Sequence, residues 1–197
     1  MIADRNSLIA AVGDWLDRDD LAARAGTFIQ LAEARLNRLL DDPEMEVTAT
    51  YSADGDWTPL PEDFGSMVSI STGNGSLQAT GPVEFASYRS IGGTPRRYSI
   101  YDGGIGFAPT NASATIALVY KRRLPALSES TPTNWLLTLA PDAYLYGALV
   151  QAEGFLAEDD RVAGWKAMFD EAIGELRGDA DKRRWGSGPI APRINRP

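Results

Sequence analysis

Among the adjacent carboxylates of the chain, Asp41-Asp42 and Asp159-Asp160 resemble pairs that could perform acid–base catalysis. Two carboxyl groups that face each other across a cleft, about 5–10 Å apart, are the catalytic groups of a glycosidase. Both pairs, however, stand at the ends of segments with helical periodicity. An aspartate there caps free backbone N–H groups or interacts with the helix dipole, which explains the pairs without catalysis. A carboxylate-based glycosidase is therefore the weakest of three hypotheses on function.

Two glycine-containing stretches resemble ligand loops but fit turns better. Asp54-Gly55-Asp56 begins like a calcium loop, yet the further oxygen ligands and the distal glutamate of such a loop do not follow. Gly103-Gly104-Ile105-Gly106 lies between two strand-like runs and lacks the lysine and hydroxyl residue that end a phosphate loop. We interpret both stretches as turns, and predict no catalytic residue, no metal site and no cofactor site.

The composition excludes several kinds of catalytic and metal-binding site. The 197 residues include no histidine and no cysteine, which excludes histidine-based triads, thiolate metal sites and disulfides. Hydrophobic residues make up 44% of the chain and charged residues 23%, enough for one sizeable core or two small ones. No apolar run approaches the ~20 residues that span a bilayer, so we predict a soluble protein without membrane association.

The formal net charge of −8 is unevenly distributed. Residues 177–197 contain six basic and two acidic residues, a net charge of +4, so the rest of the chain carries −12. An acidic body argues against tight coating of nucleic acid, although DNA can still pass it without being gripped. A basic end on an acidic body suggests that this end docks on an acidic or polar groove elsewhere.

Helical periodicity is strongest near the two ends of the chain. Apolar residues recur at helical spacing between residues 8 and 40, in a short helix and a longer one that stops before Pro43. The stretch 133–176 predicts a helical hairpin. Gly147 and Gly154 share a face of its first helix, where close packing must compensate for the cost of glycine. The expected bundle core includes Phe28, Leu36, Leu145, Leu149, Trp165 and Phe169.

The middle of the chain is rich in strand-forming residues and turns. Alternating runs occur at 47–51, 67–72, 97–101 and 114–120. The predicted fold is thus α+β but mainly α, namely a four-helix bundle with an inserted small antiparallel β-rich unit and an extended C-terminal tail. The expected segments are the N-terminal helices (1–43), the β-rich unit (44–127), the helical hairpin (128–178) and the tail (179–197).

The C-terminal tail contains residues that a purely solvating tail lacks. Tryptophan and arginine often dominate interfaces, and proline lowers the entropy that a segment loses on docking. We therefore predict that residues 179–197 form a docking arm. Its candidate contacts are Lys182, Arg183, Arg184, Trp185, Ile190, Arg193, Ile194 and Arg196. Tyr144 and Tyr146 cannot both lie on the stripe of Leu145, so they are candidates for contact with a neighbouring subunit.

Several runs together carry a resemblance to a known family. The most specific are Thr-Asn-Trp-Leu-Leu (133–137), Pro-Asp-Ala-Tyr-Leu-Tyr-Gly-Ala-Leu (141–149) and Phe-Leu-Ala-Glu-Asp-Asp-Arg-Val-Ala-Gly-Trp (155–165). Supporting runs are 28–38, 60–64, 93–100 and 114–120. With these runs the chain resembles, over nearly its whole length, the head-to-tail adaptor proteins of tailed bacteriophages, also called connector or head-completion proteins. The tail is matched only by its position.

The resemblance implies a structural virion protein of the neck, located at the head-to-tail junction and made in the host bacterial cytoplasm. It implies a dodecameric ring that binds beneath the portal protein and extends the DNA channel. DNA would pass through the lumen without specific binding, and the C-terminal arms would contact the portal. The next tail or neck component, a stopper, nozzle or tail terminator, would bind below the ring. An adaptor of this kind is not an enzyme.

A third hypothesis concerns the β-rich unit alone. Its aromatic residues Trp57, Tyr88, Tyr98 and Tyr101 are of the type that glycan- or receptor-binding modules of phage tails use. This hypothesis requires that the aromatic side chains share one exposed face. The glycosidase hypothesis requires instead a pair of carboxylates that face each other in a pocket.

Overall fold

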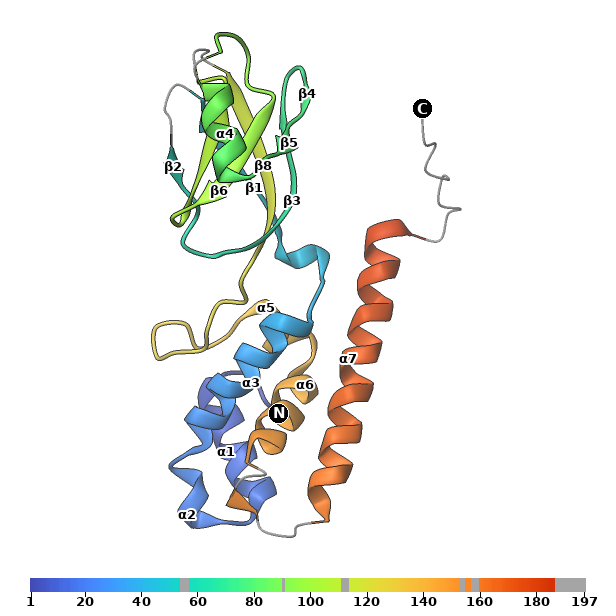
Figure 1. Cartoon of the computed structure of the whole chain (residues 1–197). Coiled ribbons are helices and arrows are strands. Elements are labelled where there is room, and N and C mark those ends of the chain that lie inside the picture. The colour runs from blue at the N-terminus through green and yellow to red at the C-terminus, as the bar shows by residue number, and fades with distance from the viewer. Residues whose placement is uncertain (54–56, 90, 111–113, 153–154, 157–159, 187–197) are drawn as a thin grey trace. The chain divides into compact units, whose positions relative to one another are not determined.

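The computed structural model describes residues 1–53, 57–89, 91–110, 114–152, 155–156 and 160–186 (Figure 1). The chain divides into two compact units. A helical unit contains Met1–Glu44 and Leu124–Pro197, and a β-rich unit contains Met45–Arg123. The chain therefore leaves the helical unit once, builds the β-rich unit, and returns.

The predicted mainly α four-helix bundle is wrong. Of the described residues, 48% are helical and 23% lie in strands, so the fold is α+β with two sheets. Within the described residues, the helical unit has six α-helices instead of four: α1 (Arg5–Leu16), α2 (Asp19–Ala22), α3 (Ala25–Leu39), α5 (Trp135–Leu139), α6 (Pro141–Gln151) and α7 (Arg161–Trp185). Helices α2 and α5 are four and five residues long. So short a helix contains too little of the 3.6-residue period to be recognised from the sequence.

Side chains at the helix ends fix where the helices begin. The cap of α1 is Asp4, whose carboxylate accepts a hydrogen bond from the Ser7 backbone N–H at 2.8 Å. The Ser7 hydroxyl in turn accepts one from the Asp4 N–H at 3.0 Å, which completes a capping box. Asn134 caps α5 by accepting from the Leu137 N–H at 2.9 Å. Pro141 begins α6, where its missing N–H has no cost.

Helix α6 is the centre of the helical unit and lies between α3 and α7 (Figure 1). It is apolar on all sides, as expected of a buried helix. A Cβ atom at Gly147 would lie 3.0 Å from Phe169 Cε2 and 3.3 Å from the Ala32 Cβ, so the three helices approach closely there. Gly154 lies outside the described residues. The side chains of Phe28, Leu36, Leu145, Leu149, Trp165 and Phe169 are all buried.

The β-rich unit contains two four-stranded sheets. The first has the order β1 (Glu46–Ser52), β8 (Thr115–Arg122), β3 (Phe64–Thr72) and β4 (Gly75–Ser76), and all its pairs are antiparallel. The second has the order β2 (Thr58–Pro59), β7 (Gly104–Ala108), β6 (Arg97–Tyr101) and β5 (Gln78–Ala79). The pair β5–β6 is parallel, which the predicted all-antiparallel unit did not include. A 3-10 helix, η1 (Pro43–Met45), precedes β1.

The two sheets share one hydrophobic core. Strand β8 alternates, and directs Ile116, Leu118 and Tyr120 inward. These side chains belong to the same buried cluster as Ile105 and Phe107 of β7. Helix α4 (Pro82–Arg89) packs on β6 and β7 (Figure 1). The four strand-like runs of the sequence are confirmed as parts of β1, β3, β6 and β8.

Replacing Gly147 by leucine should destabilise the protein by about 1–3 kcal/mol, because the larger side chain would overpack the contact with Phe169 and Ala32. Urea denaturation followed by far-UV circular dichroism measures the change. The matched control is Gly174→Ala in α7, where an added Cβ meets no atom within 4 Å. That variant should be stabilised by up to ~1 kcal/mol. Equal stabilities of Gly147→Leu and the wild type would contradict the close packing.

Candidate functional site

The end of α7 carries four of the predicted docking residues, Lys182 to Trp185. The sequence pattern placed residues 179–185 in the extended tail, but α7 continues through them. Ala180 is buried and extends the apolar stripe of Trp165, Phe169 and Leu176. The helix ends at Gly186, which has a positive φ of 61°, a backbone geometry that glycine adopts without strain. The three basic residues of the last turn also suit the negative end of the helix dipole.

Three arginines of α7 bind the end of α3. Arg177 Nη2 donates to the Leu39 carbonyl at 3.1 Å, which satisfies an acceptor that the end of α3 leaves without a partner. Arg183 forms an ion pair with the buried carboxylate of Asp42. Arg184 Nη2 lies 2.9 Å from Asp41 Oδ1. We call Arg177, Arg183 and Arg184, with these partners, the arginine clamp.

The arginine clamp explains one of the two carboxylate pairs that resemble catalytic groups in the sequence. Asp41 and Asp42 each bind a different arginine, and the Asp42 carboxylate also accepts from the Glu44 N–H at 3.0 Å. These carboxylates therefore hold two helices together. Of the other pair, Asp159 lies outside the described residues. No group of three or more acidic side chains placed to hold a metal ion occurs among the residues that the structure describes.

Lys182 and Trp185 make other contacts than those of the arginine clamp. Lys182 Nζ pairs with Asp179 Oδ1 at 2.8 Å within the same helix. The hydrogen bond from Lys182 lowers the pKa of Asp179, and the same bond raises the pKa of Lys182. Trp185 is 56% exposed although it is a large aromatic residue. The remaining predicted docking residues, Ile190, Arg193, Ile194 and Arg196, lie outside the described residues.

Tyr144 is buried, so the predicted subunit contact does not hold for it. Its hydroxyl donates to Glu33 Oε1 at 3.3 Å and accepts from Asn134 Nδ2 at 2.6 Å. Glu33 Oε1 also accepts from the Leu127 N–H at 2.7 Å. Burial raises the pKa of Glu33 and that of Tyr144. No sequence pattern predicts this network, because its members are up to 111 residues apart.

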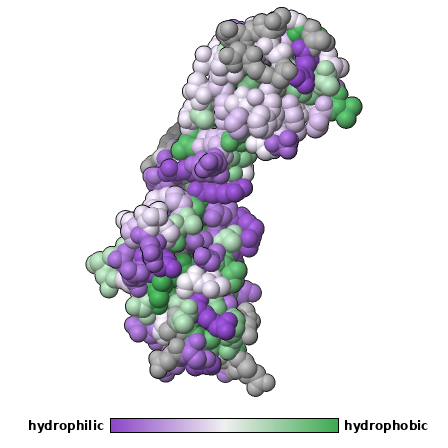
Figure 2. Space-filling view, turned by 90° about the vertical axis from the view of Figure 1, so that its left-hand side faces the viewer, coloured by the Kyte–Doolittle hydropathy of each residue, from purple (hydrophilic) through white to green (hydrophobic). Residues whose placement is uncertain are grey.

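Tyr146 lies on the other side of α6 and contacts Trp15 of α1. The two rings meet edge to face with their centroids 5.7 Å apart, and Trp15 is 43% exposed. Other large apolar side chains exposed on the helical unit are Leu31, Leu139, Phe155 and Met168. On the face seen in Figure 2, apolar side chains of this unit form separate patches between hydrophilic ones. The Trp15–Tyr146 pair is thus a candidate for contact with another copy of the chain.

The aromatic residues of the β-rich unit do not form one exposed platform. Tyr98 packs against the core between the sheets, and the Arg97 guanidinium carbon lies 3.8 Å from the centre of the Tyr88 ring. Trp57 is partly exposed, and its indole N–H donates to the Tyr101 carbonyl at 3.2 Å. The indole also occupies the space beside Gly104, where a Cβ would lie 2.1 Å from Trp57 Cε2. Trp57 therefore serves the fold of the β6–β7 hairpin.

Comparison with known families identifies the class of protein. The family model of the SU10 adaptor protein matches residues 4–193, which is nearly the whole chain. The chain belongs to the SU10 adaptor protein family, and is a phage adaptor, a structural protein of the virion that associates with other head and tail components. No curated protein shows significant similarity to the chain. None of the helices in the described residues has the length and apolar character that crossing a bilayer requires.

The raised pKa of Glu33 predicts a pH-dependent stability. Folding raises this pKa above its ordinary value of 4.5, so the folded state binds the proton more tightly than the unfolded state. The resulting stabilisation is complete below pH 4.5 and is lost as the pH rises through the folded-state pKa. Glu33→Gln keeps an oxygen acceptor for Leu127 and Tyr144 but does not titrate.

Urea denaturation of both proteins at pH values from about 4 to 8 tests this prediction. The free energy of unfolding of the wild type, minus that of Glu33→Gln, should fall as the pH rises. The subtraction removes the titration of the other carboxylates, which both proteins share. A difference that stays constant over this range would mean that folding does not change the proton affinity of Glu33.

Arg183→Gln should destabilise the protein by about 1–3 kcal/mol, because it removes a charged donor from the buried carboxylate of Asp42. The matched control is Lys182→Gln, one residue away and with the same loss of charge. The Lys182 ion pair is exposed, so the melting temperature of that variant should not change. Equal melting temperatures of the two variants would show that the arginine clamp does not hold α7.

Proposed function

We propose that the protein is a head-to-tail adaptor that forms a ring of about twelve copies beneath the portal protein. The observation that carries this proposal is the family match over residues 4–193. The ring extends the DNA channel from the head into the tail. Its far side receives the next neck or tail component, of the stopper, nozzle or tail-terminator type.

Adjacent copies of the ring meet through unlike surfaces, as in any closed ring with rotational symmetry. Trp15 and Tyr146 suit such a contact, because tyrosine and tryptophan are enriched at interfaces and these two rings already support each other. Burying Trp15 against a neighbouring copy would remove one of the largest exposed apolar side chains of the helical unit.

The charge of the chain supports passage of DNA through the ring. Each copy carries a formal net charge of −8. A lumen lined with acidic side chains repels the phosphate backbone and does not bind it, so DNA slides through without specific contacts.

The docking arm begins at Trp185 and includes residues 186–197. Helix α7 has 25 residues and is therefore about 38 Å long. The arginine clamp fixes the end of this helix to α3, so the direction in which the arm leaves the helical unit is set before the portal is bound. Fixing that direction lowers the entropy that the arm loses on docking.

The native mass of the purified chain, alone and mixed with the portal ring of the same phage, tests the proposal. We expect the portal ring to gain about twelve copies. A chain that ends at Gly186 keeps the arginine clamp, so it should fold with an unchanged melting temperature and fail to bind the portal. A full-length chain that stays monomeric beside the portal would overturn the adaptor ring, and a truncated chain that still binds would overturn the arm.

Trp185→Ala should weaken portal binding by about 1–2 kcal/mol if the exposed indole is an anchor of the arm. Met168→Ala is the control, because Met168 is an exposed apolar residue of the same helix that lies outside the proposed arm. Titration calorimetry with the portal ring separates the two variants. Equal affinities would remove Trp185 from the interface.

A further inference from the structure

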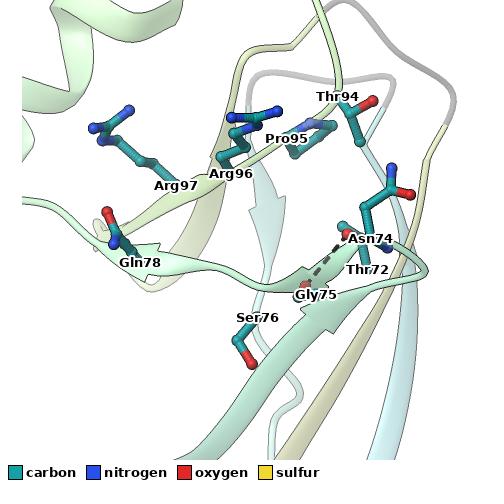
Figure 3. Close-up of a pocket in the computed structure, with 9 residues that line it drawn as sticks. All are labelled: Thr72, Asn74, Gly75, Ser76, Gln78, Thr94, Pro95, Arg96 and Arg97. Atoms are coloured by element: carbon teal, nitrogen blue, oxygen red, sulfur yellow. Dashed lines mark hydrogen bonds between the residues drawn. The ribbon is translucent and has the colours of Figure 1, made fainter. Parts of the chain in front are cut away.

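The β-rich unit contains a polar pocket of about 560 Å³ where the chain crosses from the first sheet to the second. One wall is the turn from Thr72 to Ser76, between β3 and β4. The other wall is the segment Thr94–Arg97, which leads into β6, and Gln78 of β5 joins the two (Figure 3). The volume is within the range of small-molecule sites, roughly 300–1,000 Å³.

Backbone geometry holds both walls in place. Gly75 and Gly93 have φ values of 122° and 132°, which residues with a side chain rarely adopt. After the first turn, the Leu77 N–H donates to the Ile70 carbonyl at 3.1 Å, and the Gln78 N–H donates to the Arg96 carbonyl at 2.9 Å. One short segment is therefore bonded to both sheets, so the pocket exists before any ligand binds.

The lining is composed almost wholly of neutral polar and basic groups. Its hydroxyl and amide side chains belong to Thr72, Asn74, Ser76, Gln78 and Thr94, its guanidinium groups to Arg96 and Arg97, and an apolar side chain to Pro95. Among the described residues, no carboxylate lines the pocket and no acidic side chain pairs with either arginine. The pocket thus offers donors for an anion and hydrogen-bonding groups for hydroxyls.

The two arginine side chains differ in their contacts. The Arg97 guanidinium lies over the Tyr88 ring, with its central carbon 3.8 Å from the ring centre, and this contact fixes its position. Arg96 is exposed; its backbone N–H donates to the Ala108 carbonyl at 2.9 Å and its carbonyl accepts from the Gln78 N–H, so these bonds hold its backbone and leave the guanidinium exposed. One guanidinium that stacks on an aromatic ring, beside another that is exposed, suits a planar carboxylate. Arginine can bind a carboxylate with two parallel hydrogen bonds.

A second, smaller pocket of about 270 Å³ shares Thr94, Arg96 and Arg97 with the first. Its other lining residues include Tyr88, Ile91 and Pro109, so it adds apolar surface directly beside the arginines. A sugar ring has both kinds of surface, because its hydroxyls project outward and its C–H groups form apolar faces. The two pockets together match that combination better than they match an inorganic anion.

The lining residues also favour a saccharide over a macromolecular ligand. A peptide segment gains most of its affinity from apolar anchors, and Pro95 is the one apolar side chain among the described residues that line the larger pocket. A DNA backbone requires a row of cations along its phosphates, whereas this pocket has two adjacent arginines. We propose that the pocket is a binding site for an acidic saccharide, with Arg96 and Arg97 on its carboxylate and the hydroxyl and amide side chains on its ring hydroxyls.

This site lies in the β-rich unit and does not depend on portal binding. NMR titration of the ¹⁵N-labelled full chain tests it with tri-galacturonate and with sialyllactose. We expect shifts of the Gly73 and Gly75 amides and of the Asn74 and Gln78 side-chain amides. The methyl ester of tri-galacturonate, neutral lactose and inorganic phosphate should bind at least roughly tenfold more weakly, because each lacks either the carboxylate or the hydroxyls.

Arg96→Gln is the test variant, because its side chain makes no ion pair in the described structure and its loss should not disturb the fold. It should weaken binding of the acidic saccharides roughly tenfold. Arg123→Gln removes the same charge from an exposed position of the same unit outside the pocket, and should bind like the wild type.

Three results would overturn the proposal. The first is the absence of pocket shifts with both acidic saccharides. The second is binding of phosphate, or of a short aspartate-rich peptide, with equal affinity and with shifts of the same amides. That result would make the pocket a general anion site. The third is equal weakening in Arg96→Gln and Arg123→Gln, which would mean that only the net charge of the unit matters.

Discussion

The helical unit depends on the hydrogen bonds between α3 and the segment of chain that returns from the β-rich unit. The returning segment 124–127 belongs to no helix or strand, so its backbone N–H groups need partners from elsewhere. The Asn37 side chain accepts from the Leu124 N–H at 2.7 Å, and the Glu33 carboxylate accepts from the Leu127 N–H. Glu33 also accepts from Tyr144 of α6. One face of α3 therefore fixes both the returning chain and the central helix.

The same helix fixes α7 at its other end. Asp41 and Asp42 follow α3 directly, and with the Leu39 carbonyl they are the partners of the arginine clamp. The sequence predicts a basic tail on an acidic body. Within the subunit, however, Arg183 and Arg184 already pair with Asp42 and Asp41. At the end of α7 the exposed Lys182 pairs with Asp179, and Trp185 is an exposed large apolar side chain. The docking hypothesis therefore depends less on the basic residues of α7 and more on Trp185 and the residues that follow it.

Sequence patterns predicted the elements whose cause is local, and failed where the cause is distant. The alternation of Ile116, Leu118 and Tyr120 identified β8, because every second residue faces one core. The predicted hairpin ended at residue 178, but the apolar stripe that Ala180 continues carries α7 on to Trp185. The hydroxyl of Tyr144 finds an acceptor 111 residues away, which no window of sequence shows. The resemblance to phage adaptors succeeded because it uses the whole chain at once.

The polar pocket was invisible in the sequence for the same reason, since its lining comes from three separate segments. Its position in the fold also separates it from the adaptor role. The core of the β-rich unit is formed by residues of that unit alone, and the arginine clamp and the Glu33 network lie wholly in the helical unit. Surface residues such as Arg96 and Asn74 can therefore change without disturbing the contacts that orient α7. An insertion built in this way lets an assembly protein acquire a ligand site while its helical unit keeps the geometry that assembly requires.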